Sequence, residues 1–332
     1  MIAPGAASES IAQAAELLLA GGLVGMPTET VYGLAANASS AEAVAKIFAA
    51  KGRPSDHPLI VHVANASGVA AFASSVPAFA EKLIAAFWPG PLTLILPRRP
   101  EVAAAAAGGQ NSVGLRCPAH PVAQALLAAC AARGVAGLAA PSANKFGRVS
   151  PTTAAHVLAE FGSELLVLDG GPCAVGIESA IVDCTRGVPV LLRPGVLTAA
   201  QIEAACGQRL RSADEMDAAP RASGTLEAHY APTAKVRLMD AGALQTALDV
   251  LASTQTQGPP AIAVWSRAAL KVRSATVLAR RMPDDAASVA QLLFGVLREF
   301  DGQGVKLVWV ETPPPLPEWA GVLDRLQRAA AS

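Results

Sequence analysis

The chain has 332 residues, of which 52% are hydrophobic and 16% are charged. Lys plus Arg and Asp plus Glu number 26 each, whereas a protein whose main task is to coat nucleic acid usually carries a basic excess. The mean hydropathy is +0.39, but no window of about 18 residues lacks charged and turn-forming residues, which excludes a membrane-spanning helix. The length predicts two domains, and the absence of a basic run before an apolar core at the start predicts a cytoplasmic protein without a secretory signal.

Strand and helix signals alternate along the first two thirds of the chain. An amphipathic helix is predicted over 10–20, and a short buried strand follows over 23–26. Further strands are predicted at 59–63, 92–96, 113–116, 135–139, 165–169, 179–183 and 188–193, and further helices at 78–87, 122–132 and 151–161. Several of these strands are too close in sequence for parallel crossovers, so we expect an α/β domain with a mixed, twisted sheet.

One predicted turn brings two cations together. Ser39 and Glu42 form a capping box at the start of the helix that precedes this turn. Gly52 suits the C-cap of that helix, which places Lys51 and Arg53 on a helix-to-strand turn.

The pattern lapses between 210 and 225, where linker-like residues gather. We therefore predict a catalytic domain over 1–210, a linker over 211–234 and a second domain over 235–332. In the second domain, strands are predicted at 236–239, 261–265 and 305–310, with helices at 241–252, from Pro283 to about 300, and at 319–330. This alternation predicts a smaller Rossmann-like α/β domain, and no G-x-G-x-x-G motif indicates dinucleotide binding.

Four cations fall at the ends of predicted elements, near Gly or Pro: Lys51, Arg53, Arg116 and Arg193. A lone arginine is more often a solvated surface charge. Charged residues at strand ends, however, commonly form the walls of sites in α/β proteins. Arginine can grip phosphate oxygens in two places and lysine acts as a point charge, so this group suits a triphosphate.

Polar residues on loops could complete such a site. Ser142, Asn144 and Ser150 follow a predicted buried strand; they could simply cap their own turn, or present hydroxyl and amide oxygens to a phosphate or a hydrated magnesium ion. His62 ends an apolar strand and could be a satisfied core histidine. Thr30 could hold the polar end of an amino acid or could be a simple turn residue.

Nucleophilic and metal chemistry find little support. The five cysteines are odd in number, widely spaced and without a Cys-x-x-Cys pair, which predicts buried free thiols and neither disulfides nor zinc. Ser179 lacks a G-x-S-x-G context and Cys173 lacks a histidine partner. We expect neither to act as a nucleophile.

An aromatic motif, His229-Tyr230-Ala231-Pro232, lies in the predicted linker. Such a segment could dock against a domain through its apolar surface. It could instead close over the first domain's opening as a lid. The sequence leaves both alternatives open.

Taken together, the motifs resemble those of one family. They are Pro27-Thr28-Glu29-Thr30-Val31-Tyr32-Gly33-Leu34, Lys51-Gly52-Arg53-Pro54, Pro58-Leu59-Ile60-Val61-His62, Trp88-Pro89-Gly90-Pro91-Leu92-Thr93, Ser112-Val113-Gly114-Leu115-Arg116 and Ser142-Ala143-Asn144. In this order they resemble the YrdC-like family, in its long two-domain form, the L-threonylcarbamoyladenylate synthases. The segments 229–232, 294–304 and 324–326 resemble the linker and the smaller domain of that form.

The resemblance implies a nucleotidyltransferase that makes threonylcarbamoyl-AMP and pyrophosphate from L-threonine, bicarbonate or CO2, and ATP, for N6-threonylcarbamoyladenosine in tRNA. It implies threonine contacts from Thr30, His62, Arg116, Ala140 and Ser179. It implies ATP contacts from Arg53, His57, Ser112, Ser142, Ser150, Arg193 and Tyr230. It implies catalytic roles for Lys51, Arg53, Ser142 and Asn144. Mg²⁺ would be held mainly through the phosphates of ATP, without direct protein ligands.

The resemblance also implies a downstream partner, a tRNA threonylcarbamoyltransferase complex, with weak or absent binding of tRNA itself and no membrane. Three positions depart from the family pattern: Ala140 replaces a frequent Ser or Thr, His57 a frequent Asn, and Ala180 a frequent Thr. None of these removes a charged anchor. Two alternatives are a protein that binds double-stranded RNA or tRNA, and a carbamoyltransferase of hydrogenase maturation. The latter needs zinc fingers that these cysteines cannot supply.

Overall fold

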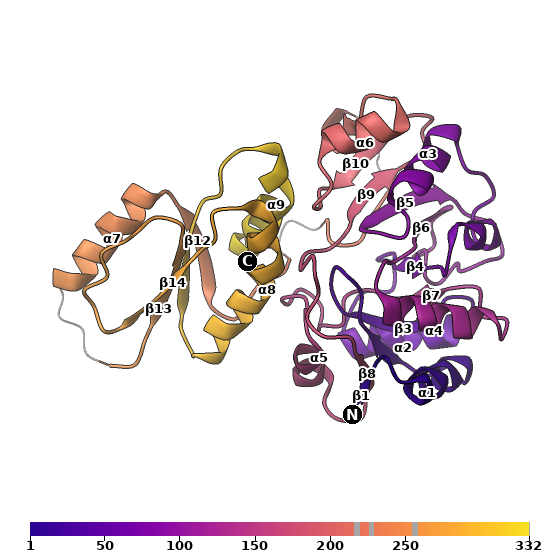
Figure 1. Cartoon of the computed structure of the whole chain (residues 1–332), viewed down its shortest axis with the longest axis horizontal. Coiled ribbons are helices and arrows are strands. Elements are labelled where there is room, and N and C mark those ends of the chain that lie inside the picture. The colour runs from indigo at the N-terminus through magenta and orange to yellow at the C-terminus, as the bar shows by residue number, and fades with distance from the viewer. Residues whose placement is uncertain (216–219, 226–228, 254–257, 332) are drawn as a thin grey trace. The chain divides into compact units, whose positions relative to one another are not determined.

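The structure is a computed structural model that describes residues 1–215, 220–225, 229–253 and 258–331. Residues 216–219 and 226–228, which belong to the predicted linker, lie outside the described residues. The chain divides into two compact units (Figure 1). The first comprises Met1–Phe146 with Ser150–Thr225, and the second comprises Gly147–Val149 with Leu226–Ser332.

The first unit is built on one large mixed sheet. In spatial order its described strands are β1 (Ile2–Pro4), β8 (Leu166–Asp169), β2 (Val24–Met26), β3 (Gly33–Asn37), β7 (Leu138–Ala139), β4 (Ile60–His62), β6 (Ser112–Arg116), β5 (Leu92–Pro97), β9 (Ala180–Asp183), β10 (Val190–Arg193) and β11 (Arg211–Ser212). Parallel and antiparallel neighbours both occur: β4 is parallel to β6, whereas β5 is antiparallel to β6. The predicted mixed α/β fold is confirmed.

Strand β3 was not predicted, and its burial explains why. Its sequence, Gly-Leu-Ala-Ala-Asn, has low β propensity and no polar face. Leu34 and Ala36 belong to one hydrophobic core and Ala35 to another. Because successive side chains of a strand point to opposite faces, these two cores lie on the two sides of the sheet. A strand buried on both faces shows no alternation that sequence reading could detect.

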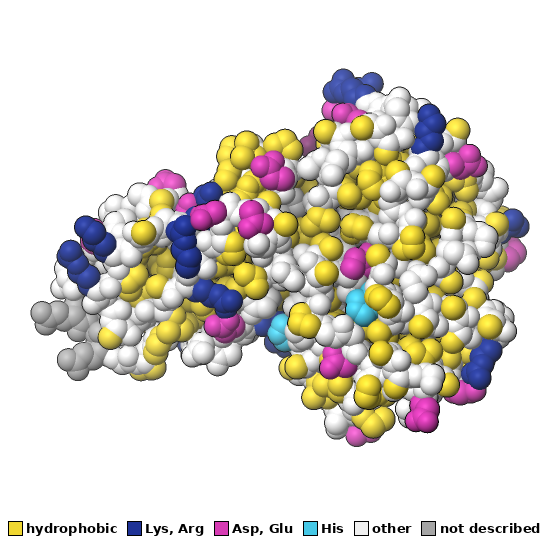
Figure 2. All heavy atoms as spheres, viewed as in Figure 1, with side chains coloured by type: hydrophobic (Ala, Val, Ile, Leu, Met, Phe, Trp, Pro, Cys, Tyr) yellow, Lys and Arg dark blue, Asp and Glu magenta, His cyan; other side chains and the backbone are white. Residues whose placement is uncertain are grey.

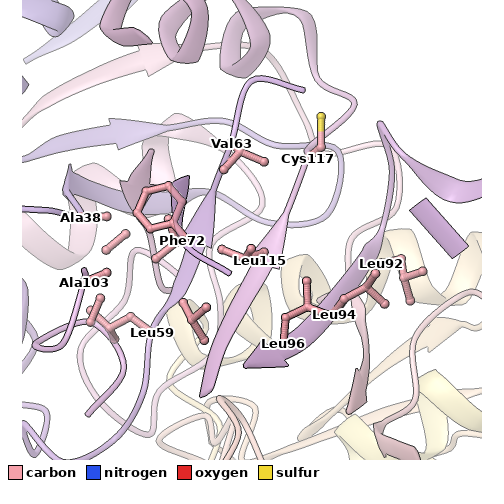
Figure 3. Close-up of a cluster of buried hydrophobic side chains, with 14 of the residues drawn as sticks. Ala38, Leu59, Val63, Phe72, Leu92, Leu94, Leu96, Ala103, Leu115 and Cys117 are labelled. Carbon is pink, nitrogen blue, oxygen red and sulfur yellow. The ribbon is translucent and has the colours of Figure 1, made fainter. Parts of the chain in front are cut away.

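Helices cover both sides of this sheet. The core that contains Ala35 includes residues of α1 (Ser8–Leu19) and α4 (Pro121–Ala131), which pack against each other. The other core includes residues of α2 (Ala41–Lys51), α3 (Ala78–Phe87), α5 (Ala154–Phe161) and α6 (Ala199–Cys206). In this second core the side chains of Leu59, Phe72 and Leu115 gather beside β4 and β6 (Figure 3). Helix α6 was not predicted, although Thr198 and Gln201 form its capping box.

The start of helix α2 corrects one prediction. Ser40, and not Ser39, is the N-cap: its side chain accepts a hydrogen bond from the backbone N–H of Ala43, at 3.1 Å. The reason is that Ser40 keeps an extended backbone directly before the first helical residue. The end of the helix agrees with the prediction, because Gly52 is the C-cap with a φ of 63°, in the left-handed region.

The described cysteines are free and buried, as predicted; they are Cys117, Cys130, Cys173, Cys184 and Cys206. Burial raises the pKa of the Cys130 thiol to about 11 and that of Cys173 to about 12. At neutral pH these thiols are therefore protonated and poor nucleophiles. Within the described part of the chain, no helix has the length and apolar character that crossing a membrane requires.

The second unit contains a parallel sheet with the described strand order β12 (Lys235–Met239), β15 (Leu307–Glu311), β13 (Ile262–Ser266) and β14 (Val277–Arg281). Its helices are α7 (Ala241–Ser253), α8 (Ala286–Gly302) and α9 (Ala320–Ala330). This is the predicted Rossmann-like alternation, although β14 was missed. Helix α8 does not begin at Pro283: Asp285 is its N-cap and accepts a hydrogen bond from Ser288 N–H at 2.8 Å. A short 3-10 helix spans Pro317–Trp319 in this unit, and two others span Ala66–Ala71 and Ala213–Glu215 in the first unit.

Candidate active site

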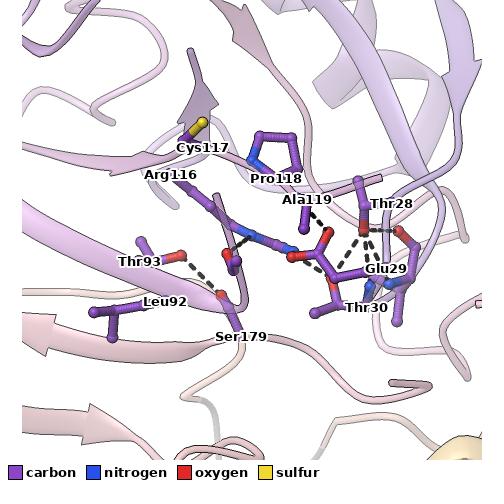
Figure 4. A network of polar contacts seen from close by, with 12 residues as sticks. Thr28, Glu29, Thr30, Leu92, Thr93, Arg116, Cys117, Pro118, Ala119 and Ser179 are labelled. Atoms are coloured by element: carbon purple, nitrogen blue, oxygen red, sulfur yellow. Dashed lines mark hydrogen bonds and ion pairs between the residues drawn. The ribbon is translucent and has the colours of Figure 1, made fainter. Parts of the chain in front are cut away.

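Arg116 is the centre of a buried polar network in the first unit (Figure 4). It ends β6, and its strand partner across the parallel β4–β6 pair is His62. Its Nη1 donates to Thr30 Oγ1 at 2.8 Å, and its Nη2 lies 2.7 Å from Glu29 Oε1. Its Nε donates to the carbonyl of Gly90 at 3.2 Å. The fold thus joins two predicted threonine contacts and adds Glu29, whose pairing with a distant arginine no local pattern revealed.

His62 is buried and neutral. Burial, assisted by the positive charge of Arg116, lowers the pKa of His62 to about 3. Its Nδ1 has no hydrogen-bond partner among the described residues, so a polar group of a ligand could satisfy this nitrogen. Ala140 lies next to the same strand, since its N–H donates to the carbonyl of Ile60 at 3.0 Å. A neutral imidazole beside Arg116 adds no second positive charge that would repel the ammonium group of an amino acid.

Ser179, a predicted threonine contact, is bonded to Arg193, a predicted ATP contact. Its Oγ lies 2.8 Å from Thr93 Oγ1, and Arg193 Nη2 donates to the same Oγ at 3.3 Å. Arg193 Nε also donates to the Ser179 carbonyl at 3.1 Å. Thr93 was not singled out from the sequence, although it belongs to the Trp-Pro-Gly-Pro-Leu-Thr motif. These bonds fix the arginine directly beside the serine.

The Lys-x-Arg and Ser-x-Asn motifs meet in the folded unit. Lys51 Nζ donates to the carbonyl of Ser142 at 2.6 Å and to the carbonyl of Asn144. The N–H of Phe146 donates to the Lys51 carbonyl at 2.9 Å. Burial, and then the charge of Arg53, holds the pKa of Lys51 well below its usual range. In this structure Lys51 therefore fixes the backbone of the Ser-x-Asn loop.

Arg53, His57 and Phe146 form a second group. The guanidinium of Arg53 lies 5.7 Å from the centroid of the Phe146 ring, and the rings of His57 and Phe146 are 5.5 Å apart, edge to face. Burial and the charge of Arg53 lower the pKa of His57. Phe146 was missed by the sequence reading, although it follows the Ser-x-Asn motif by two positions. An aromatic ring beside an arginine is a suitable neighbour for a nucleotide base.

A small cavity of about 20 Å³ is lined by residues of β4, β5, β6 and β9. Ser112, a predicted ATP contact, lines it, and so do residues 221–223 from the predicted linker. The carbonyl of Ser223 accepts a hydrogen bond from Arg193 Nη1 at 2.8 Å, and its Oγ accepts one from Arg53 Nη2 at 3.5 Å. Arg221 pairs with Asp56 at 2.5 Å. The described linker residues next to the cavity are therefore 221–223, which the sequence did not single out.

Tyr230 belongs to the second unit and is almost completely buried there, at 1% exposure. Its ring centroid lies 5.5 Å from that of Phe294 and 5.4 Å from the guanidinium carbon of Arg325. Its φ is 61°, which an L-residue adopts only where the surroundings impose it. In this structure the Tyr230 ring packs within the second unit, and the closing of this segment as a lid stays a prediction. Contact between Tyr230 and ATP stays a prediction.

The described residues offer little for metal binding, and the face drawn in Figure 2 offers little for nucleic-acid binding. Among the described residues, no group of three or more His, Cys, Asp or Glu side chains could hold a metal ion. On the face drawn in Figure 2, the Lys and Arg side chains of the first unit lie apart from one another and near acidic side chains. This distribution on that face does not resemble the basic stripe of a nucleic-acid-binding surface.

Comparisons with known proteins identify the family of this chain. A family model of the Sua5, YciO and YrdC proteins, described as Telomere recombination, matches residues 16–195. The chain belongs to the Sua5/YciO/YrdC family. A second model, described as Threonylcarbamoyl-AMP synthase, C-terminal domain, matches residues 197–331 of this family member. The resemblance inferred from the sequence motifs is confirmed.

Two curated relatives of this Sua5/YciO/YrdC protein match over nearly their full lengths. The threonylcarbamoyl-AMP synthase of Bacillus subtilis is 38% identical over 327 residues, covering 96% of this chain and 92% of its own. That of Pyrococcus abyssi is 36% identical, with coverages of 96% and 93%. The crystal structure of P. abyssi Sua5 complexed with L-threonine matches with a TM-score of 0.86 and 36% identity, covering 96% of this chain and 94% of that chain.

The low pKa of His62 in this family member predicts a pH dependence of folding stability. The pKa is about 3 in the folded protein and 6.5 for an unperturbed histidine. Between these values the unfolded chain binds more protons than the folded one. The contribution of His62 to the free energy of unfolding is therefore complete above pH 6.5. Between pH 6.5 and about pH 3 it decreases by up to about 1.4 kcal/mol for each unit of acidification.

Urea unfolding of the wild type and of His62→Gln at pH 4.5, 5.5 and 7 measures this effect. We expect the free energy of unfolding of the wild type to fall more steeply with acidification than that of the variant. Parallel pH profiles for the two proteins would show that His62 is not held neutral by burial.

Proposed function

We propose that this Sua5/YciO/YrdC family member synthesises L-threonylcarbamoyl-AMP and pyrophosphate from L-threonine, bicarbonate or CO2, and ATP. The observations that carry the proposal are the buried polar network of Arg116 with Thr30 and Glu29, at the strand position paired with His62, and the hydrogen bonds from Arg193 to Ser179. Together they provide groups for an amino acid and groups for phosphates within the first unit. Relatives that share about the full length of this chain carry the name of this activity, and one is a complex with L-threonine.

In this proposal the threonine contacts are Thr30, His62, Arg116, Ala140 and Ser179. Arg116 binds the threonine carboxylate and shares its guanidinium between that group and Glu29, 2.7 Å away. The orphan Nδ1 of His62 accepts from the amine or the hydroxyl of the substrate. Ala140 has no side-chain oxygen, so only its backbone contributes.

The proposed ATP contacts of the first unit are Arg53, His57, Ser112, Ser142, Ser150 and Arg193. Arg53 and Arg193 bind phosphate oxygens, since a guanidinium can grip two of them at once. Both now bond to Ser223, so we propose that phosphates replace this linker residue when ATP binds. Lys51 and Asn144 shape the loop that faces the phosphates. ATP enters as its Mg²⁺ complex, with the metal held mainly by the phosphates.

The proposed reaction requires the protein to orient the two anionic reactants and to neutralise the charge on the leaving pyrophosphate. The amine of threonine combines with CO2, or with bicarbonate with loss of water, to give an N-carboxylate. One oxygen of this carboxylate attacks the α-phosphorus of ATP; the new O–P bond forms as the bond from the α-phosphorus to the bridging oxygen breaks, and pyrophosphate leaves. No protein nucleophile is needed, which agrees with the protonated, buried thiols. Arginine side chains and Mg²⁺ stabilise the charge that develops on the leaving group.

The proposal also covers the domain division and the cellular setting of the reaction. We propose that residues 1–210 form the catalytic domain, 211–234 the linker and 235–332 a second domain. The product then serves the N6-threonylcarbamoylation of adenosine in tRNA, carried out in the cytoplasm by a separate transferase complex.

A direct test of the whole proposal is to incubate the protein with ATP, Mg²⁺, L-threonine and bicarbonate and to measure pyrophosphate. Omission of any one component should abolish its release.

Substrate selectivity gives a sharper expectation. Threonine should be preferred to serine, and valine should be strongly rejected, because valine has threonine's shape without the hydroxyl. Leaving a buried hydrogen-bonding group unpaired costs roughly 1–3 kcal/mol, or about 5- to 150-fold in kcat/KM. Pyrophosphate release with each amino acid at equal concentration measures the ratio. Equal release with threonine and valine would contradict the assignment of threonine as the substrate.

A further inference from the structure

The loop that contains the Ser-x-Asn motif runs over residues 142–150 and is here called the Ser-x-Asn loop. Three residues from its middle, Gly147–Val149, belong to the second unit. The N–H of Ala231 donates to the Gly147 carbonyl at 2.9 Å, and Arg148 forms a parallel β-bridge with Ala231. Arg298, on α8, donates from Nη2 to the carbonyl of Val149. Backbone pairing and a charged side chain therefore hold this segment within the second unit.

The same segment lies between residues that the proposed function assigns to ATP. Asn144 precedes it by three positions, and Lys51 binds the carbonyls of Ser142 and Asn144. Ser150 follows it directly, is fully buried, and donates from Oγ to Glu178 Oε1. The two ends of the loop are thus fixed in the first unit, and its middle is fixed in the second.

Arg298 can affect the position of Ser150 through the peptide bond that joins Val149 to Ser150. Consecutive Cα atoms are about 3.8 Å apart across one rigid peptide plane, so a displacement of the Val149 carbonyl turns the peptide that ends at the Ser150 nitrogen. A hydrogen bond from a guanidinium to a carbonyl is charge-assisted and stronger than one between neutral groups. Val149 is itself buried, at 3% exposure, which limits the competition of water for its carbonyl.

We propose that Arg298 is a positioning residue for this reaction: through Val149 it sets the placement of Ser150 and of the Ser-x-Asn loop against ATP. The inference rests on the proposed function for the identity of the reaction. It gives the second unit a part in catalysis that its parallel sheet, without a dinucleotide motif, does not suggest.

The test compares Arg298→Ala with Arg281→Ala, in the full-length chain. Arg281 is a matched control because it is an exposed arginine of the same unit, paired with Asp284 at 3.0 Å. We expect Arg298→Ala to lower kcat about ten-fold, since small misplacements of a contact residue slow the chemical step. KM for threonine should not change, because the proposed threonine contacts are bonded within the first unit. Arg298→Lys, which can still donate to the carbonyl, should recover part of kcat.

Hydrogen–deuterium exchange supplies a readout that does not depend on activity. Without substrates, the peptide 142–152 should exchange faster in Arg298→Ala than in Arg281→Ala, while peptides of β4 and β6 stay unchanged. A kcat equal to that of the control, or an unchanged exchange rate of the loop, would overturn the proposal. If Arg298→Ala unfolds, Arg298→Gln and Arg298→Lys carry the same comparison. If the wild type releases no threonine-dependent pyrophosphate, the proposed function has failed, whereas the exchange data still report whether Arg298 anchors the loop.

Discussion

Arg53→Ala is expected to lower kcat/KM for ATP by about 100- to 1,000-fold while the protein stays folded, since removal of one preorganised group that stabilises transition-state charge has effects of this size. In the structure Arg53 donates to the carbonyl of Pro58 at 3.0 Å and to Ser223 Oγ at 3.5 Å. Losing one such bond costs about 1 kcal/mol of folding stability. Activity and stability should therefore separate. Pyrophosphate release at varied ATP, together with thermal melting, measures both.

The control for Arg53 is Arg133→Ala in the same unit. Arg133 is half exposed and forms a surface ion pair with Glu16 at 2.6 Å, a kind of contact worth about 0–1 kcal/mol. It should reduce neither ATP use nor stability appreciably. If Arg53→Ala matched this control at saturating and at limiting ATP, the phosphate role of Arg53 would be wrong. Arg53→Lys should be intermediate, because lysine keeps the charge but loses the two-point grip.

Arg116→Met should abolish synthesis and also destabilise the fold, by about 3–5 kcal/mol, because it leaves the buried carboxylate of Glu29 without its charged partner. The two side chains are 4% and 11% exposed, so water cannot replace the lost interaction. Urea unfolding measures the loss of stability. Pyrophosphate release at high threonine concentration measures the loss of substrate binding.

The double variant Glu29→Gln with Arg116→Met separates the two effects. A neutral glutamine can still accept the N–H of Ala119, which lies 3.1 Å from Glu29 Oε2, and no buried charge remains uncompensated. We expect it to recover most of the stability and none of the synthesis. Equal stability of the single and the double variant would contradict the role of the ion pair. Wild-type KM for threonine in either variant would contradict the role of Arg116 in binding.

Much of the architecture could be read from the sequence, because local signals are strong where one face of an element is polar. The helix at 78–87 was predicted with its observed bounds, and Gly52 marked the end of α2 by its left-handed conformation. The parallel second sheet followed from the alternation of strands with helices. Strands β1 and β3 were missed, since one is three residues long and the other is built from Gly, Ala, Leu and Asn and buried on both faces.

For the site, the sequence by itself determined which residue types and motifs are present. The order of the motifs was specific enough to indicate the family, and the places of Lys51, Arg53, Arg116 and Arg193 at element ends made them candidates. Only the tertiary structure decided what these cations contact. The pairing of Arg116 with Glu29 and the bonds of Arg193 to Ser179 and Ser223 depend on strand order and register, which a single sequence does not encode locally. The division of the linker, with 221–223 beside the cavity and Tyr230 in the second unit, likewise depends on which surfaces each segment can cover once both units have folded.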